Sequence, residues 1–370
     1  MPIRPTHAEI DLAALRHNYQ TLRRQAGDRQ FLAVVKANAY GHGAVPVAEC
    51  LQQAGAEFFG VALVQEGEEL RRGGIVRPIL VLGGVVPGDE AALLAADLTP
   101  AIFDLAGARR LDAAAAAAGR RCRYHLKVDS GMGRLGFRPD DLPGVLQQLA
   151  ALQHLEMEGV ISHLALADEE EHPFTAVQVE RFREAQRQIC AAGFAPPLVH
   201  LSNSAGIYAL DLPECNMVRA GIALYGGLPA EHLAGIDLQP VMSLRTAVAQ
   251  LKALPAGAGV SYGHRFIAER PSLIAALPVG YADGYSRHLS NCGEVLVRGR
   301  RARVAGTVCM DWTMIDVSDI PGVAVGDTVT LLGSDGAERI SAEEWAGRIG
   351  TISYEVFCLI SRRVPRVYRN

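Results

Sequence analysis

The first residue whose position suggests chemistry is Lys36, at the end of the apolar run in FLAVVKANAYGHG (31–43). An amine placed where a buried strand meets a loop is partly desolvated, and desolvation lowers the pKa of a lysine. Because a neutral amine attacks aldehydes, this position predicts Schiff-base formation. The alternative is a strand-end lysine whose amine simply reaches water.

A second group of residues could bind phosphate. Ser202 and Ser204 lie in LSNSAG (201–206), and the backbone amides of Gly221 and Ile222 lie in RAGIALYGG (219–227). If these segments follow strands 7 and 8 of a barrel, they lie where barrels commonly bind phosphate. A lysine opposite a phosphate site predicts pyridoxal phosphate (PLP) as cofactor. Ser204 could instead be a helix N-cap.

Arg219 precedes that phosphate site and could reach the ring nitrogen of such a cofactor. A carboxylate there would keep a pyridine nitrogen protonated, whereas an arginine leaves it unprotonated and limits delocalisation of a substrate carbanion. The residue type therefore favours reversible proton exchange over transamination.

These residues need a scaffold in which strand ends converge. Eight apolar runs predict strands at 31–37, 58–63, 78–84, 98–104, 123–129, 158–165, 198–204 and 216–221. Between them lie segments with helical spacing that end in glycine, among them 44–55, 66–74 and 175–193, and the alanine run 113–118, closed by Gly119. Eight strand-helix units predict a (β/α)8 TIM-type barrel over residues 8–230. A doubly wound open sheet is the alternative, but no G-x-G-x-x-G follows the first strand.

The pattern changes after about residue 235. β-rich runs such as 241–254 and 293–308 are separated by Gly, Pro and Asp turns, with one helix predicted at 341–350. We therefore expect an α/β chain with two domains, the barrel and a mainly-β domain formed by residues 231–370 together with 1–7.

Composition excludes several classes of function. Hydrophobic residues make up 49%, charged residues 21%, and the net charge is −4, which is typical of a soluble globular protein and argues against a nucleic-acid partner. The start shows no secretory signal and no segment is long and apolar enough for a membrane span, so we expect a cytoplasmic protein. Seven cysteines without C-x-x-C spacing indicate neither a disulfide framework nor a metal site. Two arginine-rich stretches, 297–304 and 361–367, are interpreted as solvated strand faces or subunit contacts rather than anion-binding surfaces.

Beyond these features, the chain resembles the bacterial alanine racemases, PLP-dependent enzymes of fold type III. The resemblance extends over nearly the whole chain, in order: AVVKANAYGHG, KVDSGMGRLG, ISHLA, SNSAG, VRAGIALYG, VSYGHRF, GYADGYSR, VCMDWTMID and ISYEV. It implies interconversion of L-alanine and D-alanine, serving either peptidoglycan synthesis or L-alanine catabolism, by a homodimer with shared active sites.

The resemblance also implies roles for individual residues. Lys36 would hold PLP and act as one base, Arg219 would contact the ring nitrogen, and His163 would lie near Arg219 or Tyr262. The phosphate would be held by Tyr40, Ser204, Gly221, Ile222 and Tyr354. Arg134 would contact the cofactor's phenolic oxygen and the substrate, beside a Lys127 that could be carbamylated; a surface pair of Lys127 with Asp129 is the alternative.

From the partner subunit, Tyr262 would supply the second base, and Met310 would contact the substrate. Asp168, Tyr281 and Arg287 would line the entry channel, where charge could steer a zwitterion. A racemase needs acid-base groups on both faces of a planar carbanion, which Lys36 and Tyr262 would provide.

Crowding beside the Cα favours alanine, although a pocket made for a methyl group rejects the hydroxyl of serine only about a hundredfold. A serine racemase is therefore an alternative, and so are a PLP-dependent decarboxylase, a noncatalytic PLP-handling barrel protein and a cofactor-free Schiff-base aldolase. Arg219 argues against the decarboxylase, which would favour a carboxylate at the ring nitrogen. The residues after 230 argue against the noncatalytic protein, which resembles the first domain alone. The phosphate-site residues argue against the cofactor-free aldolase.

Overall fold

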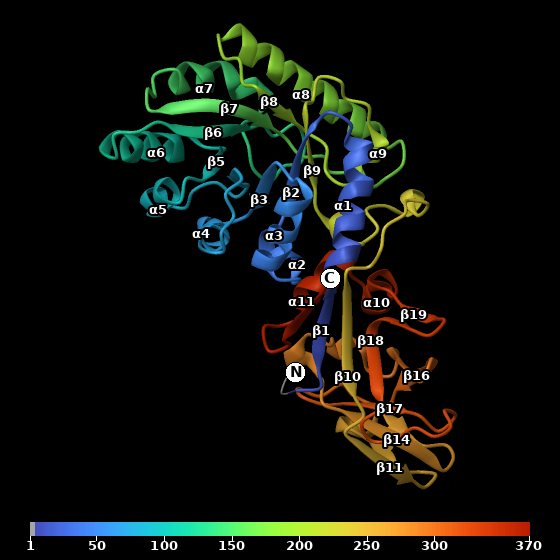
Figure 1. The fold of residues 1–370 in the computed structure, drawn as a ribbon. Coiled ribbons are helices and arrows are strands. Elements are labelled where there is room, and N and C mark those ends of the chain that lie inside the picture. The colour runs from blue at the N-terminus through green and yellow to red at the C-terminus, as the bar shows by residue number, and fades with distance from the viewer. Residues whose placement is uncertain (1–3) are drawn as a thin grey trace.

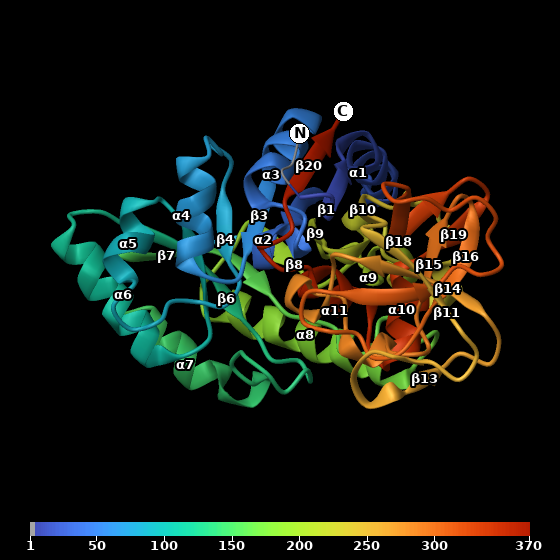
Figure 2. The same ribbon diagram turned by 90° about the horizontal axis from the view of Figure 1, so that it is seen from below.

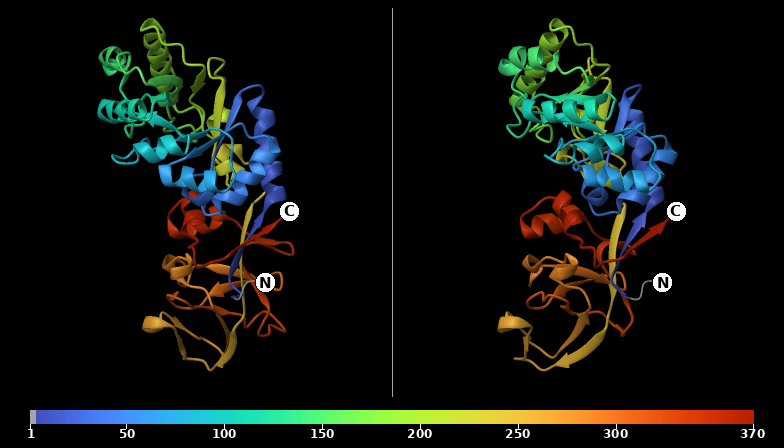
Figure 3. Two further views of the ribbon diagram at one scale, coloured as in Figure 1. Left: turned by 60° about the vertical axis from the view of Figure 1, so that its left-hand side comes forward. Right: turned by 90° about the vertical axis from the view of Figure 1, so that its left-hand side faces the viewer.

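The computed structural model describes residues 4–370 and consists of two parts (Figures 1 and 3), a barrel and a mainly-β unit. Residues 1–3, expected to belong to the second domain, lie outside the described residues. Figure 1 shows strands β1 and β10 running from the barrel into the mainly-β unit, so two chain segments connect the parts. The predicted fold class is confirmed.

The barrel contains the eight predicted strands. They are β2 (Gln30–Val34), β3 (Phe58–Val61), β4 (Ile79–Val81), β5 (Thr99–Ile102), β6 (Cys122–Lys127), β7 (Leu155–Ile161), β8 (Leu198–His200) and β9 (Met217–Ala220). All pair in parallel, in chain order from β2 to β8, with β9 on the other side of β2. The Arg219 amide donates to the Ser202 carbonyl at 3.1 Å and links the two ends of the sheet, so the barrel is nearly closed. The order shows no reversal, which excludes the doubly wound alternative.

Helices cover the outside of the barrel (Figure 2). They are α1 (Leu12–Ala26), α3 (Ala44–Ala54), α4 (Val64–Arg72), α5 (Glu90–Ala95), α6 (Leu105–Ala117), α7 (Leu142–Leu149), α8 (Pro173–Ala191) and α9 (Gly206–Ala209), with the short α2 (Lys36–Tyr40) at the barrel mouth. The alanine run forms the second half of α6, whose first turn is capped by Asp104, accepting from the Gly107 amide.

The mainly-β unit contains a large sheet ordered β11-β14-β17-β16-β15-β18-β10-β1-β20. Its strands are β1 (His7–Asp11), β10 (Met242–Ala247), β11 (Gln250–Leu254), β14 (Ser272–Leu277), β15 (Glu294–Val297), β16 (Arg300–Val304), β17 (Thr313–Asp316), β18 (Thr328–Asp335), β19 (Glu338–Ile340), which pairs with β18, and β20 (Arg366–Arg369), beside a separate pair of β12 (Gly259–Val260) and β13 (Phe266–Ile267). The predicted helix is α10 (Ala342–Ile349), and a second helix, α11 (Ser353–Leu359), was not predicted.

The N-terminal strand differs from the expected division of the chain. Residues 8–11 were expected in the barrel, but they lie in β1, which pairs antiparallel with β10 and parallel with β20. Ala8 and Ile10 are fully buried in this sheet. The strand partners lie more than two hundred residues away along the chain, so local pattern could not reveal them.

Two further expectations concern the surface. In the arginine-rich stretch 297–304, Arg301 pairs with Glu294 at 2.9 Å and Glu344 at 2.6 Å, as on an ion-paired strand face. Within residues 4–370, no helix combines the length and apolar character needed to cross a membrane.

Candidate active site

A cavity of about 660 Å³ lies where the carboxyl ends of the barrel strands meet α11. Ten of the residues predicted to act from the barrel or from ISYEV contribute to its lining, whereas Ser202 and Asp168 do not. The ten are Lys36, Tyr40, Lys127, Arg134, His163, Ser204, Arg219, Gly221, Ile222 and Tyr354. These residues come from the ends of five strands, β2, β6, β7, β8 and β9, and from one helix of the second unit, so the fold brings together positions spread over more than three hundred residues.

Lys36 begins a left-handed turn rather than ending a strand. β2 ends at Val34, and Ala37, Asn38, Ala39 and Tyr40 have φ values of 52°, 55°, 52° and 51°. Left-handed backbone is costly for residues with a Cβ, and such strain concentrates at functional sites. Lys36 and Tyr40, at the two ends of this turn, both line the cavity. Burial, and secondarily the charge of Arg134, lowers the pKa of the Lys36 amine.

A carboxylate that the sequence did not point to holds this turn. Glu66, in the first turn of α4, accepts hydrogen bonds from the amides of Ala37 at 2.6 Å and Ala62 at 2.7 Å. Asn38 closes the other end by accepting from the Ala44 amide at 2.9 Å. The only sequence signal for Glu66 is that it begins the predicted helical segment 66–74; the structure starts α4 at Val64, which places Glu66 three residues after the N-cap Leu63.

Arg219 lines the cavity and is only 3% exposed. Its Nη2 donates to the carbonyls of Ser162 at 2.7 Å and Leu201 at 3.0 Å, and its Nη1 donates to the carbonyl of His200 at 3.0 Å. Burial lowers the pKa of Arg219 to about 10. Among the described residues Nε has no acceptor, so its N–H is the donor left for a molecule in the cavity.

His163 lies beside Arg219, with Nδ1 at 3.2 Å from Nη2. Burial and the nearby positive charges of Arg219 and Lys127 lower the pKa of His163 to about 2, which keeps the imidazole neutral. Since a guanidinium only donates, His163 Nδ1 is the acceptor.

The cavity lining also includes neutral donors. Ser204 Oγ accepts from the Gly221 amide at 2.9 Å, which leaves the hydroxyl hydrogen free. Ile222 opens a 3-10 turn (Ile222–Tyr225), so its N–H has no acceptor inside that turn. Burial raises the pKa of the Tyr354 phenol to about 12 and raises that of Tyr40 further. Ser204 is not a simple N-cap, because Asn203 Oδ1 accepts from Gly206, the first residue of α9.

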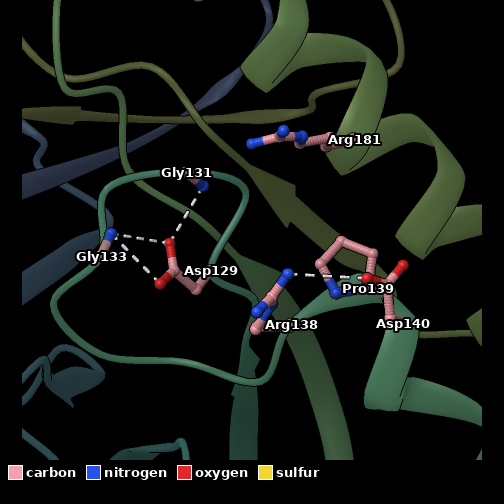
Figure 4. Close-up of a pocket in the computed structure, with 7 residues that line it drawn as sticks. All are labelled: Asp129, Gly131, Gly133, Arg138, Pro139, Asp140 and Arg181. Atoms are coloured by element: carbon pink, nitrogen blue, oxygen red, sulfur yellow. Dashed lines mark hydrogen bonds and ion pairs between the residues drawn. The ribbon is translucent and has the colours of Figure 1, made fainter.

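Lys127 and Arg134 also line the cavity. Lys127 is 9% exposed, and burial together with the charges of Arg219 and Arg134 lowers its pKa well below the ordinary value. Asp129 is not paired with Lys127 among the described residues; its carboxylate accepts from the amides of Gly131 and Gly133 at 3.0 Å. Figure 4 shows this loop beside a second hollow of about 530 Å³, which Arg138 and Arg181 also line. Asp129 thus shapes the loop that carries Arg134.

The remaining predicted residues do not line the cavity of this chain, as far as the described residues show. Tyr262 lies in a 3-10 turn (Tyr262–His264) of the mainly-β unit and is 72% exposed, and Met310 is 53% exposed. Tyr281 and Arg287 begin two further 3-10 turns, Tyr281–Asp283 and Arg287–Leu289. Asp168 follows β7, and its charge raises the pKa of Tyr354, so it lies near the cavity.

Two lining residues on α11 also escaped the sequence analysis. Glu355 and Cys358 face the cavity beside Tyr354. The helix itself was not predicted, because its seven residues are too few for a clear period.

Comparison with known proteins confirms the family resemblance found in the sequence. Family models described as "Alanine racemase, N-terminal domain" and "Alanine racemase, C-terminal domain" match residues 10–229 and 241–368. Proteins named alanine racemase from Geobacter sulfurreducens and Symbiobacterium thermophilum are 51% and 49% identical, over 100% and 99% of this chain and 98% and 97% of theirs.

Solved structures give the same result. Alanine racemase from Streptomyces lavendulae has a TM-score of 0.95 at 38% identity, covering 100% of this chain and 98% of that chain. The Bacillus anthracis enzyme with bound L-Ala-P has a TM-score of 0.95 at 38% identity, covering 100% and 96%. From its sequence, its barrel and its full-length relatives, the chain belongs to the alanine racemase family.

Proposed function

We propose that this chain interconverts L-alanine and D-alanine with PLP held in the 660 Å³ cavity, using Lys36 as one base and Tyr262 of the partner subunit as the other. The observation that carries the proposal is the meeting of a desolvated lysine, a buried arginine and a set of neutral phosphate donors in one cavity.

The cavity fits PLP in charge and shape. Its basic residues, Lys36, Lys127, Arg134 and Arg219, suit an anionic occupant, because binding an anion favours their protonated forms. Gly221 leaves the necessary space, because a Cβ there would lie 2.7 Å from the Tyr40 hydroxyl oxygen. Ser204, Tyr40, Tyr354 and the Ile222 amide would hold the phosphate. When bound, the cofactor would withdraw electrons from the substrate and acidify its Cα–H bond.

The chain's own groups divide the remaining work. With its pKa lowered by burial, Lys36 can be an uncharged amine able to accept the Cα proton. Arg219 would donate its Nε–H toward the cofactor's ring nitrogen and, with a pKa of about 10, would stay protonated near neutral pH. His163 Nδ1 accepts a hydrogen bond from Nη2 of Arg219 and so helps to orient the guanidinium. Together they favour proton return to Cα over transfer of the amino group.

The second base would come from a second copy of the chain. Tyr262 and Met310 project from the mainly-β unit with large exposed fractions. Thr307 Oγ1 donates to the Tyr262 carbonyl at 2.9 Å and fixes the turn, so the exposed ring stands on an ordered backbone. A homodimer would place this phenol and Met310 over the partner's cavity, on the face opposite Lys36.

Lys127 is proposed to be carbamylated. A buried neutral amine reacts with carbon dioxide, and the resulting anion would offset the charges of Arg219 and Arg134. The anion would also orient Arg134 toward the cofactor's phenolic oxygen and the substrate. Detection of an unmodified amine by intact mass under ambient carbon dioxide would count against this modification.

Alanine is the proposed substrate because Tyr354, Tyr262 and Met310 would crowd the Cα. Serine is the second candidate, since the pocket would reject its hydroxyl only modestly. Asp168, Tyr281 and Arg287 are proposed to line the entry channel. All seven cysteines are free thiols, as suits a reducing cytoplasmic location. D-Alanine supply for peptidoglycan and L-alanine catabolism would use the same chemistry.

The test is incubation of the purified enzyme with L-alanine in deuterium oxide. We expect D-alanine to appear with deuterium at Cα, and borohydride to fix the cofactor on Lys36. Lys36→Ala and Tyr262→Phe should each abolish racemisation. Deuterium exchange without inversion in the wild-type enzyme would contradict the assignment of two bases.

A further inference from the structure

A buried hydrogen-bond chain leads from Arg219 through the barrel core to its outer edge. Arg219 Nη1 lies 3.2 Å from His200 Nδ1, and His200 Nε2 lies 2.7 Å from His125 Nδ1. His125 Nε2 lies 3.3 Å from Glu158 Oε2. The histidines are 0% and 1% exposed, in an interior that barrels usually fill with branched apolar side chains.

Only one arrangement of protons satisfies every contact of neutral histidines in this chain. A guanidinium cannot accept, so His200 Nδ1 must accept and His200 carries its proton on Nε2. That proton is donated to His125 Nδ1, which leaves the His125 proton on Nε2, facing Glu158. Burial lowers the pKa of both histidines, which agrees with neutral rings. In each imidazole the acceptor nitrogen therefore faces the Arg219 end of the hydrogen-bond chain, and the N–H donor faces the Glu158 end.

The hydrogen-bond chain also connects Arg219 to a negative charge, that of Glu158. Among the described residues no carboxylate contacts Arg219; its partners are carbonyls and two imidazoles. The side chain of Glu158 is 13% exposed and also pairs with Arg123 at 3.0 Å, so it remains ionised at the edge of the barrel. Hydrogen bonds in series polarise one another, so this negative charge acts on Arg219 through the two rings.

The backbone makes room for the arrangement. The pairing of β6 with β7 shifts register between Tyr124 and His125, opposite Gly159. A Cβ on Gly159 would lie 2.6 Å from His125 Nδ1. The bulge and the glycine therefore allow the ring to turn inward, where ordinary pairing would exclude it.

We propose that His125 and Glu158 are positioning residues for the reaction: through His200 they supply the negative charge that keeps the guanidinium proton on Arg219. This rests on the proposed function, in which Arg219 faces the cofactor's ring nitrogen. Without that charge Arg219 would share its proton more readily with the ring, which favours transfer of the amino group. That side reaction converts alanine to pyruvate while the nitrogen passes to the cofactor carbonyl carbon, with water supplying the oxygen of pyruvate.

The first arm of the test is NMR of the purified wild-type enzyme labelled with ¹⁵N-histidine, which does not depend on turnover. We expect the signals of His125 and His200 to show neutral rings protonated on Nε2 between pH 7 and 8. A proton on Nδ1 of either ring, or a charged ring, would overturn the proposal even if the enzyme racemises alanine.

The second arm measures the ratio of racemisation to pyruvate formation. This ratio is internal to each preparation, so incomplete folding of a variant leaves it unchanged. Glu158→Gln keeps an acceptor for His125 but removes the charge, and we expect the ratio to fall by about 2- to 30-fold. The matched control is Glu156→Gln, two residues before Glu158 on β7, which removes an exposed carboxylate that pairs with Arg121. Its ratio should equal that of wild type.

A further pair of variants separates connection from packing. His125→Gln offers both an acceptor and a donor, so its ratio of racemisation to pyruvate formation should stay close to the wild-type value. His125→Leu breaks the hydrogen-bond chain, so its ratio should fall as in Glu158→Gln. A wild-type ratio for Glu158→Gln, or equal ratios for the two His125 variants, would overturn the proposal. Failure of wild type to racemise alanine would instead contradict the proposed function, and the histidine signals would then decide the hydrogen-bond chain alone.

Discussion

At the scale of single residues, the cavity is arranged for an anion. Burial lowers the pKa of Lys36, Lys127 and Arg219, and each of these shifts reflects the cost of a cation without enough counter-charge. Neutral hydroxyls and amides line the same cavity. An incoming phosphate would therefore receive hydrogen bonds from neutral donors, while its negative charge would favour the protonated forms of the nearby basic groups.

Gly221 gives a test of that phosphate site. Gly221→Ala would bring a Cβ to 2.7 Å from the Tyr40 hydroxyl oxygen, and one of the two must move. Such overpacking costs about 1–3 kcal/mol, so we expect the variant to bind PLP roughly 5- to 150-fold more weakly than wild type. Equilibrium dialysis measures this affinity. Gly144→Ala is the matched control, because its Cβ would enter open space on α7. Equal affinities in the two variants would place the phosphate elsewhere.

Much of this site could be predicted at the residue level, and the reason is local. Lys36, Ser204, Arg219 and Gly221 each follow or close an apolar strand, and a barrel turns sequence position after a strand into position around one mouth. Glu66 could not be predicted, because it acts through bonds to backbone amides that exist only once the left-handed turn has formed.

At the scale of elements, α2 is the least ordinary part of the fold. Four consecutive non-glycine residues with positive φ are costly, so external hydrogen bonds must hold them. Glu66 provides such bonds from α4, the helix that follows the next strand. Neighbouring βα units thereby fix the position of Lys36.

Replacing Glu66 by Gln should weaken this support. A carboxylate accepts from two amides through separate oxygens, whereas the amide of Gln offers only one oxygen and turns a donor toward the other. We expect a loss of about 1–3 kcal/mol in the free energy of unfolding, measured by urea denaturation. Glu69→Gln changes an exposed carboxylate on the same helix and should cost far less. Equal losses would show that the bonds to Ala37 and Ala62 do not stabilise the turn.

The position of α11 shows what sequence patterns could not supply at this scale. Its ends at Ser353 and Leu359 enclose too short a span for periodicity, and its packing against α2 joins segments more than three hundred residues apart. The same holds for β1, whose partners come from the middle and the end of the chain. Local pattern predicts elements well, but tertiary pairing decides which unit they join.

At the scale of the whole molecule, buried histidines couple folding to pH. Burial lowers the pKa of His42 to about 4, and burial with nearby cations lowers that of His163 to about 2; the pKa values of His125 and His200 are also lowered. In the unfolded chain these rings titrate near 6.5, so below that pH the unfolded state binds more protons. Stability is therefore fully present above about pH 6.5 and is lost as the pH falls.

Each such histidine should remove about 1.4 kcal/mol of unfolding free energy per pH unit on the acid side. Urea unfolding between pH 7 and pH 5 measures this slope. His42→Gln should reduce the slope by one proton, because Gln does not titrate, whereas His232→Gln, in an exposed 3-10 turn, should leave it nearly unchanged. A slope unaffected by His42→Gln would mean that this ring is charged in the folded enzyme.

The arrangement of two chains can be tested by mixing inactive variants. If Tyr262 serves the partner's cavity, a dimer of one Lys36→Ala chain and one Tyr262→Phe chain contains one site with both bases intact. Random mixing in equal amounts makes half of the dimers mixed, so activity should return to about a quarter of wild type. Mixing Lys36→Ala with the double variant Lys36→Ala/Tyr262→Phe should restore none, because every site then lacks its lysine. If Tyr262 instead served the cavity of its own chain, each intact base would remain paired with a missing one, and the first mixture would be as inactive as the second.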